Sequence, residues 1–211
     1  MQRDTPASAP TGRKSAYVAR NRKKILSAAQ EVLAEHGPES TVEAVSEKAE
    51  IAISTIYKHF DTRDALFEGA IAGAMLDWES WAFRQIDENA SALEKLVMPA
   101  RLLFRLAETH PLYAKMLATN PEVMVRALPQ LTAHLSQDVR ELAKEGVLAV
   151  DDVEIRIRNL RGAFLQTFLH KLANPDTSNR EVDKAIELAL GLLGIPADKA
   201  SEVCSKPISL K

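Results

Sequence analysis

The segment from Ile53 to Phe60 combines one apolar side with one side of hydrogen-bond donors. Ile56 and Phe60 are four residues apart, so on a helix they share a face that can pack on neighbouring helices. The remaining arc carries hydroxyl, phenol, ammonium and imidazole groups, from Ser54, Thr55, Tyr57, Lys58 and His59. Each of these groups can donate to phosphate oxygens or base edges. The pattern therefore predicts a short helix that binds DNA.

The segment before this helix reads as a longer helix over residues 21–36. Its apolar residues recur at helical spacing and form one face. Gly37 is expected as a left-handed C-cap, and Pro38 prevents the helix from continuing. This helix supplies a surface on which shorter helices can pack.

A second short helix completes the arrangement. It begins at Ser40 or Thr41 and ends near Ala49, and residues 50–52 lead to a helix over residues 53–59. Two short helices joined by a tight turn form a helix-turn-helix, whose second short helix enters the major groove. The alternative is two ordinary packed helices. We favour the DNA-binding interpretation because the apolar residues and the donors lie on separate faces.

Positive charge is local in this chain. The net charge is −2 and the pI is about 6.2, so no general attraction to nucleic acid is expected. Residues 13–24 are the exception, with six basic residues and no acidic one: Arg13, Lys14, Arg20, Arg22, Lys23 and Lys24. Taken alone, this block is best read as a solvated tail. Beside a helix-turn-helix it predicts a basic arm that contacts phosphates or the minor groove.

Residues 24–67 resemble the DNA-binding domain of the TetR family of bacterial regulators. The matching positions are Ile25, Ala28, Ala29, Leu33, Gly37, Thr41, Val45, Ala49, Ile51, Thr55, Ile56, Tyr57, His59, Phe60, Arg63 and Leu66. About a fifth of the chain is covered.

The resemblance implies roles for individual residues. Thr55 and Tyr57 occupy positions that contact the DNA backbone or nearby bases. His59 and Arg63 match phosphate-contacting positions. The remaining candidate DNA-contacting residues are Ile53, Ser54 and Lys58, which help to set operator preference, together with Thr41, Arg13 and Lys14.

Two positions depart from the family pattern. Glu50 stands where glycine is usual in the turn, so this residue must accept a left-handed backbone or alter the turn. Ala52 stands where serine usually caps the DNA-facing helix, and a missing cap costs about 1 kcal/mol. Neither change removes a DNA contact.

The rest of the chain also predicts helices, so the expected fold class is all-α with about nine helices. The hydrophobic fraction is 46% and the charged fraction 27%, values typical of a folded protein. Asp61 or Thr62 caps a fourth helix. The predicted helices after the DNA-binding domain cover residues 63–89, 91–108, 111–119, 121–145 with a break at Pro129, 151–173 and 179–194.

The expected division places a disordered leader at residues 1–12 and a helix-turn-helix domain with a basic arm at residues 13–62. A larger ligand-binding and dimerisation domain follows at residues 63–198, and residues 199–211 read as a loose tail. The tail contains the single cysteine, Cys204, for which we expect no redox role.

The resemblance implies a small-molecule cavity in the larger domain. Candidate lining residues are Trp78, Trp81, Phe104, Met116, Phe164 and Phe168. Candidate polar groups for a ligand are Arg101, Arg105, His110 and His134. Each of these residues could equally be ordinary core or surface.

The last two long helices carry apolar stripes that predict a dimer interface. The candidate interface residues are Ile157, Leu160, Phe164 and Phe168 on one helix, and Val182, Ile186 and Leu190 on the other. The family dimerises through a four-helix bundle of two such helices from each copy. The alternative is that both stripes pack inside one chain.

An enzyme or a protein-binding adaptor is the rival class. The five histidines are scattered, Cys204 has no paired ligand, and glycine-rich phosphate loops are absent. We therefore expect no catalytic residue, no metal and no cofactor. No apolar run is long enough to span a membrane, and the N-terminus lacks a signal peptide, so we expect a cytoplasmic protein.

These observations predict a transcriptional regulator that binds double-stranded DNA as a homodimer. The expected site is a palindromic operator, because two-fold protein symmetry matches two-fold DNA symmetry. We expect repression by occupancy of the promoter and release by a small-molecule effector of unknown identity.

Overall fold

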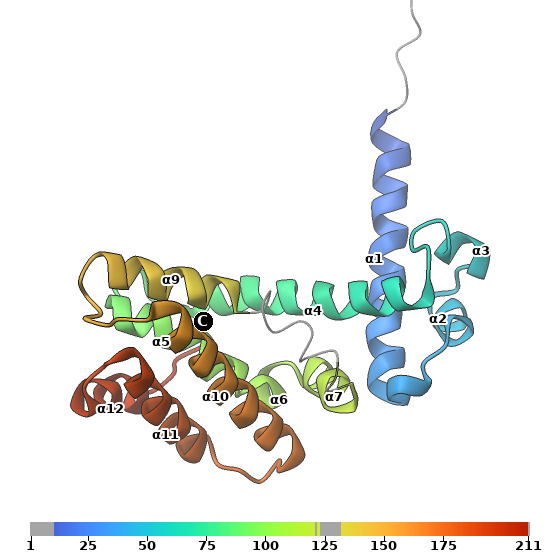
Figure 1. The fold of residues 1–211 in the computed structure, drawn as a ribbon. Helices are drawn as coiled ribbons and strands as arrows, with labels where there is room; N and C mark the ends of the chain where they lie inside the picture. The colour runs from blue at the N-terminus through green and yellow to red at the C-terminus, as the bar shows by residue number, and fades with distance from the viewer. Residues whose placement is uncertain (1–10, 121, 123–131, 211) are drawn as a thin grey trace, which may run out of the picture.

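The computed structural model describes residues 11–120, 122 and 132–210, and the predicted all-α class is confirmed over them (Figure 1). Eleven α-helices lie within these described ranges, more than the nine expected. Their bounds are α1 Thr11–His36, α2 Val42–Ala49, α3 Ile53–Ile56, α4 Arg63–Gln85, α5 Ala92–Leu103, α6 Leu106–Thr109, α7 Pro111–Thr119, α9 Ala133–Lys144, α10 Val153–Ala173, α11 Asn179–Leu190 and α12 Ala197–Ser205. Two 3-10 helices cover Gly37–Glu39 and Gly191–Leu193.

The small domain is built on α1, which crosses the start of α4, with α2 and α3 on the side away from the larger domain (Figure 1). Gly37 has a φ of +54°, as expected for the residue that ends α1. Thr41 is the N-cap of α2, because its hydroxyl accepts a hydrogen bond from the Ala44 amide at 3.1 Å. Ser40 is buried instead and donates to the carbonyl of Val32 at 3.2 Å.

The first helix begins ten residues earlier than the sequence indicated. It starts at Thr11, so residues 15–20 are helical and project beyond the rest of the small domain (Figure 1). The basic block is therefore part of α1 rather than an extended arm. Residues 1–10 of the expected leader lie outside the described part, and residues 11 and 12 belong to α1.

Helix α4 joins the two domains, beginning at the N-cap Thr62 and ending at Gln85, four residues before the predicted end. Its first half packs closely on the small domain. A Cβ atom added at Gly69 would lie 3.2 Å from Cε1 of Phe60. The Gln30 side chain donates to the carbonyl of Ala70 at 2.9 Å. Displacement of α4 therefore acts directly on α1 and on the residues that follow α3.

A second connection between the domains runs through α7. The Thr119 hydroxyl donates to the carbonyl of Leu33 in α1 at 3.1 Å. A Cβ atom added at Gly37 would lie 3.2 Å from the Cβ and the carbonyl oxygen of Thr119. The end of α1 is thus held between α2 on one side and α7 on the other.

The larger domain differs from the predicted segments in two places. The predicted helix at 91–108 is interrupted after Leu103, giving α5 and α6. Ser91 and Glu94 form a capping box at the start of α5. The predicted break at Pro129 lies outside the described residues, and α9 accounts for the end of that segment.

The expected loose tail is wrong, because residues 197–205 form α12. Ala200, Val203 and Cys204 recur at helical spacing and are buried. Arg101 on α5 donates to the carbonyls of Val203 at 3.3 Å and Lys206 at 2.9 Å. Burial raises the pKa of the Cys204 thiol to about 11, so this cysteine stays protonated and packs as an apolar group.

A charged cluster beneath α12 ties three helices together. Asp183 on α11 accepts hydrogen bonds from Arg101 at 3.0 Å and from Arg105 at 2.6 Å. Burial alone would raise the pKa of Asp183, but the bonds from both guanidinium groups lower it overall. Arg101 and Arg105, expected as ligand-binding candidates, are thus used to hold α5, α11 and α12 together.

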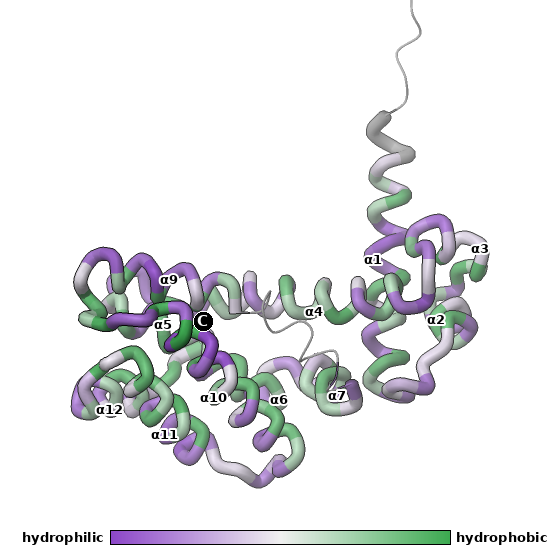
Figure 2. Tube along the Cα trace, in the orientation of Figure 1, coloured by the Kyte–Doolittle hydropathy of each residue, from purple (hydrophilic) through white to green (hydrophobic). Residues whose placement is uncertain are grey.

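The apolar stripes assigned to a dimer interface are core. Hydrophobic residues recur between hydrophilic ones along α10 and α11 (Figure 2). All seven candidates are buried within one chain: Ile157, Leu160, Phe164, Phe168, Val182, Ile186 and Leu190. The prediction that these seven side chains form the dimer interface is therefore wrong, because side chains buried within one chain cannot reach a second copy. Hydrophobic periodicity shows that a helix face is buried, but it does not show whether the same chain or a second copy buries it.

We expect Ile186→Ala to lower the free energy of unfolding by about 2–5 kcal/mol, because a fully buried side chain leaves a cavity. Arg180→Ala on the exposed side of α11 is the control and should change that free energy by less than about 0.5 kcal/mol. Urea unfolding followed by circular dichroism measures both. Equal stability of the two variants would place Ile186 outside the core.

Candidate DNA interface and effector cavity

The element predicted to face DNA is a single α-helical turn, shorter than the predicted helix at 53–59. Helix α3 ends at Ile56, and the chain reaches Phe60 through hydrogen-bonded turns. The amides of His59 and Phe60 both donate to the carbonyl of Ile56, at 2.9 and 3.0 Å. Ile56 and Phe60 are 1% and 4% exposed, so the predicted inward face is confirmed.

The donor side of this element faces solvent. Ser54, Tyr57 and Lys58 are exposed, with Tyr57 at 45%, while Ile53, Thr55 and His59 are half-buried. Within the described part of the chain, no side-chain hydrogen bond or ion pair engages Ser54, Tyr57 or Lys58. Their donors are therefore available to a bound molecule.

The turn before α3 forms despite its two unusual residues. Glu50 takes the left-handed conformation, with φ 52° and ψ 41°, and its carboxylate lies 3.2 Å from the Lys24 ammonium. The Ile51 amide donates to the carbonyl of Ser46 at 3.1 Å, and the Ser46 hydroxyl donates to the carbonyl of Ile51 at 2.7 Å. Ala52 is the N-cap of α3 and provides no side-chain bond.

Arg22 holds the turn after α3, a role that sequence analysis missed. Its guanidinium donates to the carbonyl of His59 at 3.3 Å and lies 4.4 Å from the centre of the Phe60 ring. This contact combines a charge-assisted hydrogen bond with a cation–π interaction. The basic block at residues 13–24 predicted phosphate binding only. Sequence analysis could not predict the contact between Arg22 and Phe60, because these residues come together only in the folded chain.

Arg63 is also engaged by the protein itself. Its guanidinium donates to the carbonyl of Ser40 at 2.8 and 3.1 Å and to that of Pro38 at 2.8 Å, and it lies 5.0 Å from the Phe67 ring. These bonds fix the link between α1 and α2 to the start of α4. The expected phosphate contact of Arg63 stays a prediction.

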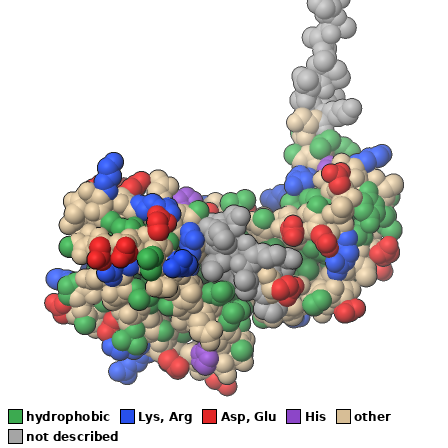
Figure 3. Space-filling view, in the orientation of Figure 1, with side chains coloured by type: hydrophobic (Ala, Val, Ile, Leu, Met, Phe, Trp, Pro, Cys, Tyr) green, Lys and Arg blue, Asp and Glu red, His purple; other side chains and the backbone are tan. Residues whose placement is uncertain are grey.

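The other predicted DNA contacts are placed only in part. The hydroxyl of Thr41 is exposed at the start of α2 but is used in capping. Arg13 and Lys14 belong to the first turns of α1, and their side chains lie outside the described residues. On the face in Figure 3, acidic and basic side chains are mixed over both domains, in keeping with the small net charge.

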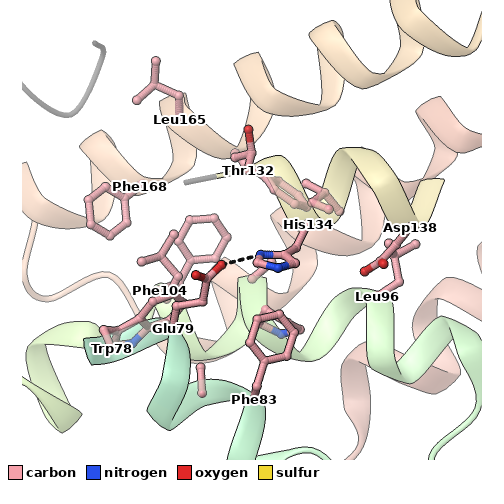
Figure 4. Close-up of a pocket in the computed structure, with 16 residues that line it drawn as sticks. Trp78, Glu79, Phe83, Leu96, Phe104, Thr132, His134, Asp138, Leu165 and Phe168 are labelled. Atoms are coloured by element: carbon pink, nitrogen blue, oxygen red, sulfur yellow. Dashed lines mark hydrogen bonds and ion pairs between the residues drawn. The ribbon is translucent and has the colours of Figure 1, made fainter. Parts of the chain in front are cut away.

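A cavity of about 770 Å³, counting the space that opens to solvent, lies between α4, α5, α9 and α10 (Figure 4). Four of the six lining candidates are on its wall: Trp78, Phe104, Phe164 and Phe168. Trp81 packs instead against His110, with ring centres 4.7 Å apart, and Met116 is fully buried elsewhere in the core.

The polar groups of this cavity are few. Glu79 and His134 face each other at 2.7 Å, and the edge of the Phe83 ring packs on the imidazole (Figure 4). Asp138 lies beside them on α9, and its pKa is raised by burial and by Glu141, against a smaller opposing effect of His134. Sequence analysis did not predict Glu79 and Asp138 as cavity residues. Glu79 lies on α4 and Asp138 on α9, and both line one cavity only because these two helices pack together.

His110, the remaining polar candidate, lies outside this cavity. Its ring stacks on Tyr113, and burial lowers its pKa. Among the described residues, no group of three or more histidine, cysteine, aspartate or glutamate side chains could hold a metal ion. None of the helices described combines the length and apolarity needed to cross a membrane.

Residues 25–70 match the sequence profile of the bacterial regulatory proteins of the tetR family. The chain carries a tetR-family DNA-binding domain. This domain contains α2, α3 and most of α1, together with the first turns of α4. No curated protein matches the chain by sequence.

Solved structures show that the tetR-family fold continues through the larger domain. The regulator RolR in complex with resorcinol is 16% identical, with a TM-score of 0.68 over 92% of this chain and 98% of the other. A TetR-family regulator from Marinobacter aquaeolei is 17% identical, with a TM-score of 0.60 over 85% and 97%. The fatty acid degradation regulator FadR from Bacillus halodurans is 19% identical, with a TM-score of 0.62 over 82% and 99%. At these identities the likeness establishes the fold alone.

We expect Arg63→Lys to lower the free energy of unfolding of this tetR-family domain by about 1–2 kcal/mol, because an ammonium group cannot reproduce three bonds to two carbonyls. Arg84→Lys, exposed at the other end of α4, is the control and should stay within about 0.5 kcal/mol of the wild type. Chemical unfolding measures both. If Arg63→Lys leaves the free energy of unfolding unchanged, the bonds from Arg63 to the two carbonyls do not stabilise the domain.

Proposed function

We propose that the chain is a cytoplasmic, ligand-responsive transcriptional repressor that binds a palindromic operator as a homodimer. The observation that carries this proposal is the division of α3 and its following turn into two sides. Ile56 and Phe60 are buried, while Ser54, Tyr57 and Lys58 present unengaged donors to solvent. A helix-turn-helix needs this arrangement to place donors in the major groove.

We further propose that the cavity of the larger domain binds the effector that releases DNA. The names of two similar structures give two candidate classes, since one regulator is bound to resorcinol and another acts on fatty acid degradation. Structural likeness does not choose between them. The position of the cavity supports an effector role, because α4 supplies four of its lining residues, Trp78, Glu79, Ala82 and Phe83.

Helix α4 supports a direct mechanical link between cavity and DNA. Its second half lines the cavity, and its first half packs against Phe60, immediately after the DNA-facing turn. A ligand that fits one position of α4 better than another shifts the spacing of the two DNA-facing helices in a dimer. The size of that shift is bounded by the difference between the affinities of the ligand for the two forms.

The proposed dimer needs a surface other than the buried stripes. On α11 the most exposed apolar side chain is Leu188, at 69%, and Ile155 is exposed near the start of α10. Both lie toward the end of the helix pair where Arg156 donates to the carbonyl of Leu192 at 2.8 Å. The outer faces of α10 and α11 therefore support an interface between two copies.

The DNA contact is tested at Lys58 after a preferred duplex has been selected from random sequences. We expect Lys58→Ala to weaken binding by about 1–3 kcal/mol at one base-pair position and to relax preference there, because the ammonium group reaches a base edge. Fluorescence anisotropy on the duplex and its single-position variants measures this. Lys144→Ala, which removes the same charge from the last turn of α9, should bind as the wild type does. An equal loss on every duplex would assign Lys58 to phosphate alone.

The dimer is tested at Leu188. We expect Leu188→Glu to yield monomers at concentrations where the wild type is dimeric, because a charged side chain is costly to bury at an apolar contact. Leu76→Glu, on an exposed position of α4, is the control. Sedimentation analysis gives the mass. A Leu188→Glu protein that stays dimeric would place the interface on another face.

A further inference from the structure

Among its described lining residues, the cavity between α4 and α10 has no lysine or arginine that could bind an acid. Two carboxylates, those of Glu79 and Asp138, lie on the wall, and the single imidazole, His134, is already bonded to Glu79 at 2.7 Å. A bound carboxylate or phosphate would lose its hydration here without gaining a cationic partner. The lining therefore disfavours anionic ligands.

One donor in the wall lacks a partner among the described residues. Trp78 is 7% exposed, and its indole Nε1 donates to no acceptor in the described part of the chain. A buried N–H group without an acceptor is unfavourable, and such groups in native structures usually mark a missing partner. Trp78 lines the cavity (Figure 4), and a ligand atom with a lone pair that reaches the buried Nε1 would supply the acceptor.

The deep wall of the cavity favours a flat ring. Phe104 packs edge-to-face on Phe164, with ring centres 5.9 Å apart and planes at 89°, and Phe168 lies 6.2 Å from Phe104. Aromatic faces and edges at these angles make favourable contacts with a further aromatic ring.

We propose that the effector is an uncharged aromatic compound with a hydroxyl group, held by its ring against the phenylalanines and by its oxygen at Trp78 Nε1. This inference rests on the proposed function, whose effector it assigns to a chemical class. The hydroxyl oxygen accepts from the indole, while Glu79 and Asp138 exclude compounds that carry a carboxylate. Aromatic alcohols are thereby separated from fatty acids and other anionic ligands.

Three matched probes test the assignment on the full-length protein by calorimetry at neutral pH. The probes are 4-propylphenol, propylbenzene and 4-propylbenzoate, which share one ring and one alkyl chain. We expect 4-propylphenol to bind best, propylbenzene about fivefold more weakly for want of one hydrogen bond, and 4-propylbenzoate more than about tenfold more weakly because its charge stays unpaired. Tighter binding of the benzoate than of the phenol, or binding of none of the three, would overturn the proposal.

Variants of the cavity residues test separately the hydrogen bond from Trp78 and the repulsion of anions by Glu79 and Asp138. Trp78→Phe keeps an aromatic ring but removes the donor, so it should weaken 4-propylphenol about fivefold and leave propylbenzene unchanged. Trp81→Phe, at the tryptophan that does not line the cavity, is the control and leaves Trp78 as the one fluorescent reporter. The double variant Glu79→Gln with Asp138→Asn should bind the benzoate more tightly than the wild type does. A Trp78→Phe protein that still prefers the phenol over propylbenzene by the wild-type factor would refute the role of Nε1.

A DNA-release assay separates this inference from the proposed function. If 4-propylphenol binds as expected but leaves the operator occupied, the chemical class stands and the effector role of the cavity fails. If an anionic compound binds in the cavity and releases DNA while 4-propylphenol does neither, the effector role stands and the assigned class is wrong.

Discussion

The structure depends on the packing that holds α3 in a fixed orientation, because this helix is too short to be stable alone. Helix α3 has four residues, and a helix of that length does not persist in water without packing. Ile56 and Phe60 supply that packing by insertion into the core of the small domain. Arg22 then fixes the following turn through the carbonyl of His59 and the Phe60 ring. The direction of every donor on the outer side follows from these contacts.

Phe60 also joins α3 and the turn after it to the rest of the molecule. Phe60 lies against Gly69, where α4 comes so close that an added Cβ atom would lie 3.2 Å from the ring. Farther along, α4 carries Trp78 and Glu79 into the wall of the cavity. The position of the DNA-facing element and the shape of the cavity are thus set by one continuous helix, with α7 as a second tie at Thr119 and Leu33. This continuity is the physical basis of the coupling between ligand and DNA that we propose.

The sequence was sufficient wherever local patterns decide the structure. The bounds of α2 and the burial of Ile56 follow from spacing and side-chain chemistry. For the caps, the sequence offered Ser40 or Thr41 and Asp61 or Thr62, and the structure shows that Thr41 and Thr62 are the caps. The beginning of α1 and the existence of α12 were not predictable in this way. Residues 11–20 are mostly polar, and α12 is stabilised by Arg101, which is distant in the sequence.

Contacts between distant segments account for the other differences. The periodicity of α10 and α11 identified apolar faces, but Ile186 proved to be core because a pattern does not name its partner. The cavity wall pairs Glu79 with His134 across 55 residues, and no local signal marks either as a ligand-binding group. Arg63 matched a phosphate-contacting position, while the fold occupies its donors with the carbonyls of Pro38 and Ser40.

The most direct test of the central claim is the affinity of the protein for a selected palindromic duplex at increasing salt concentration. In the proposed complex, Lys58 and the exposed basic side chains of α1, such as Arg20 and Lys23, neutralise several phosphates in each copy. The logarithm of the affinity should therefore fall steeply and linearly with the logarithm of the salt concentration. A flat response, or no preference for any duplex, would contradict the account.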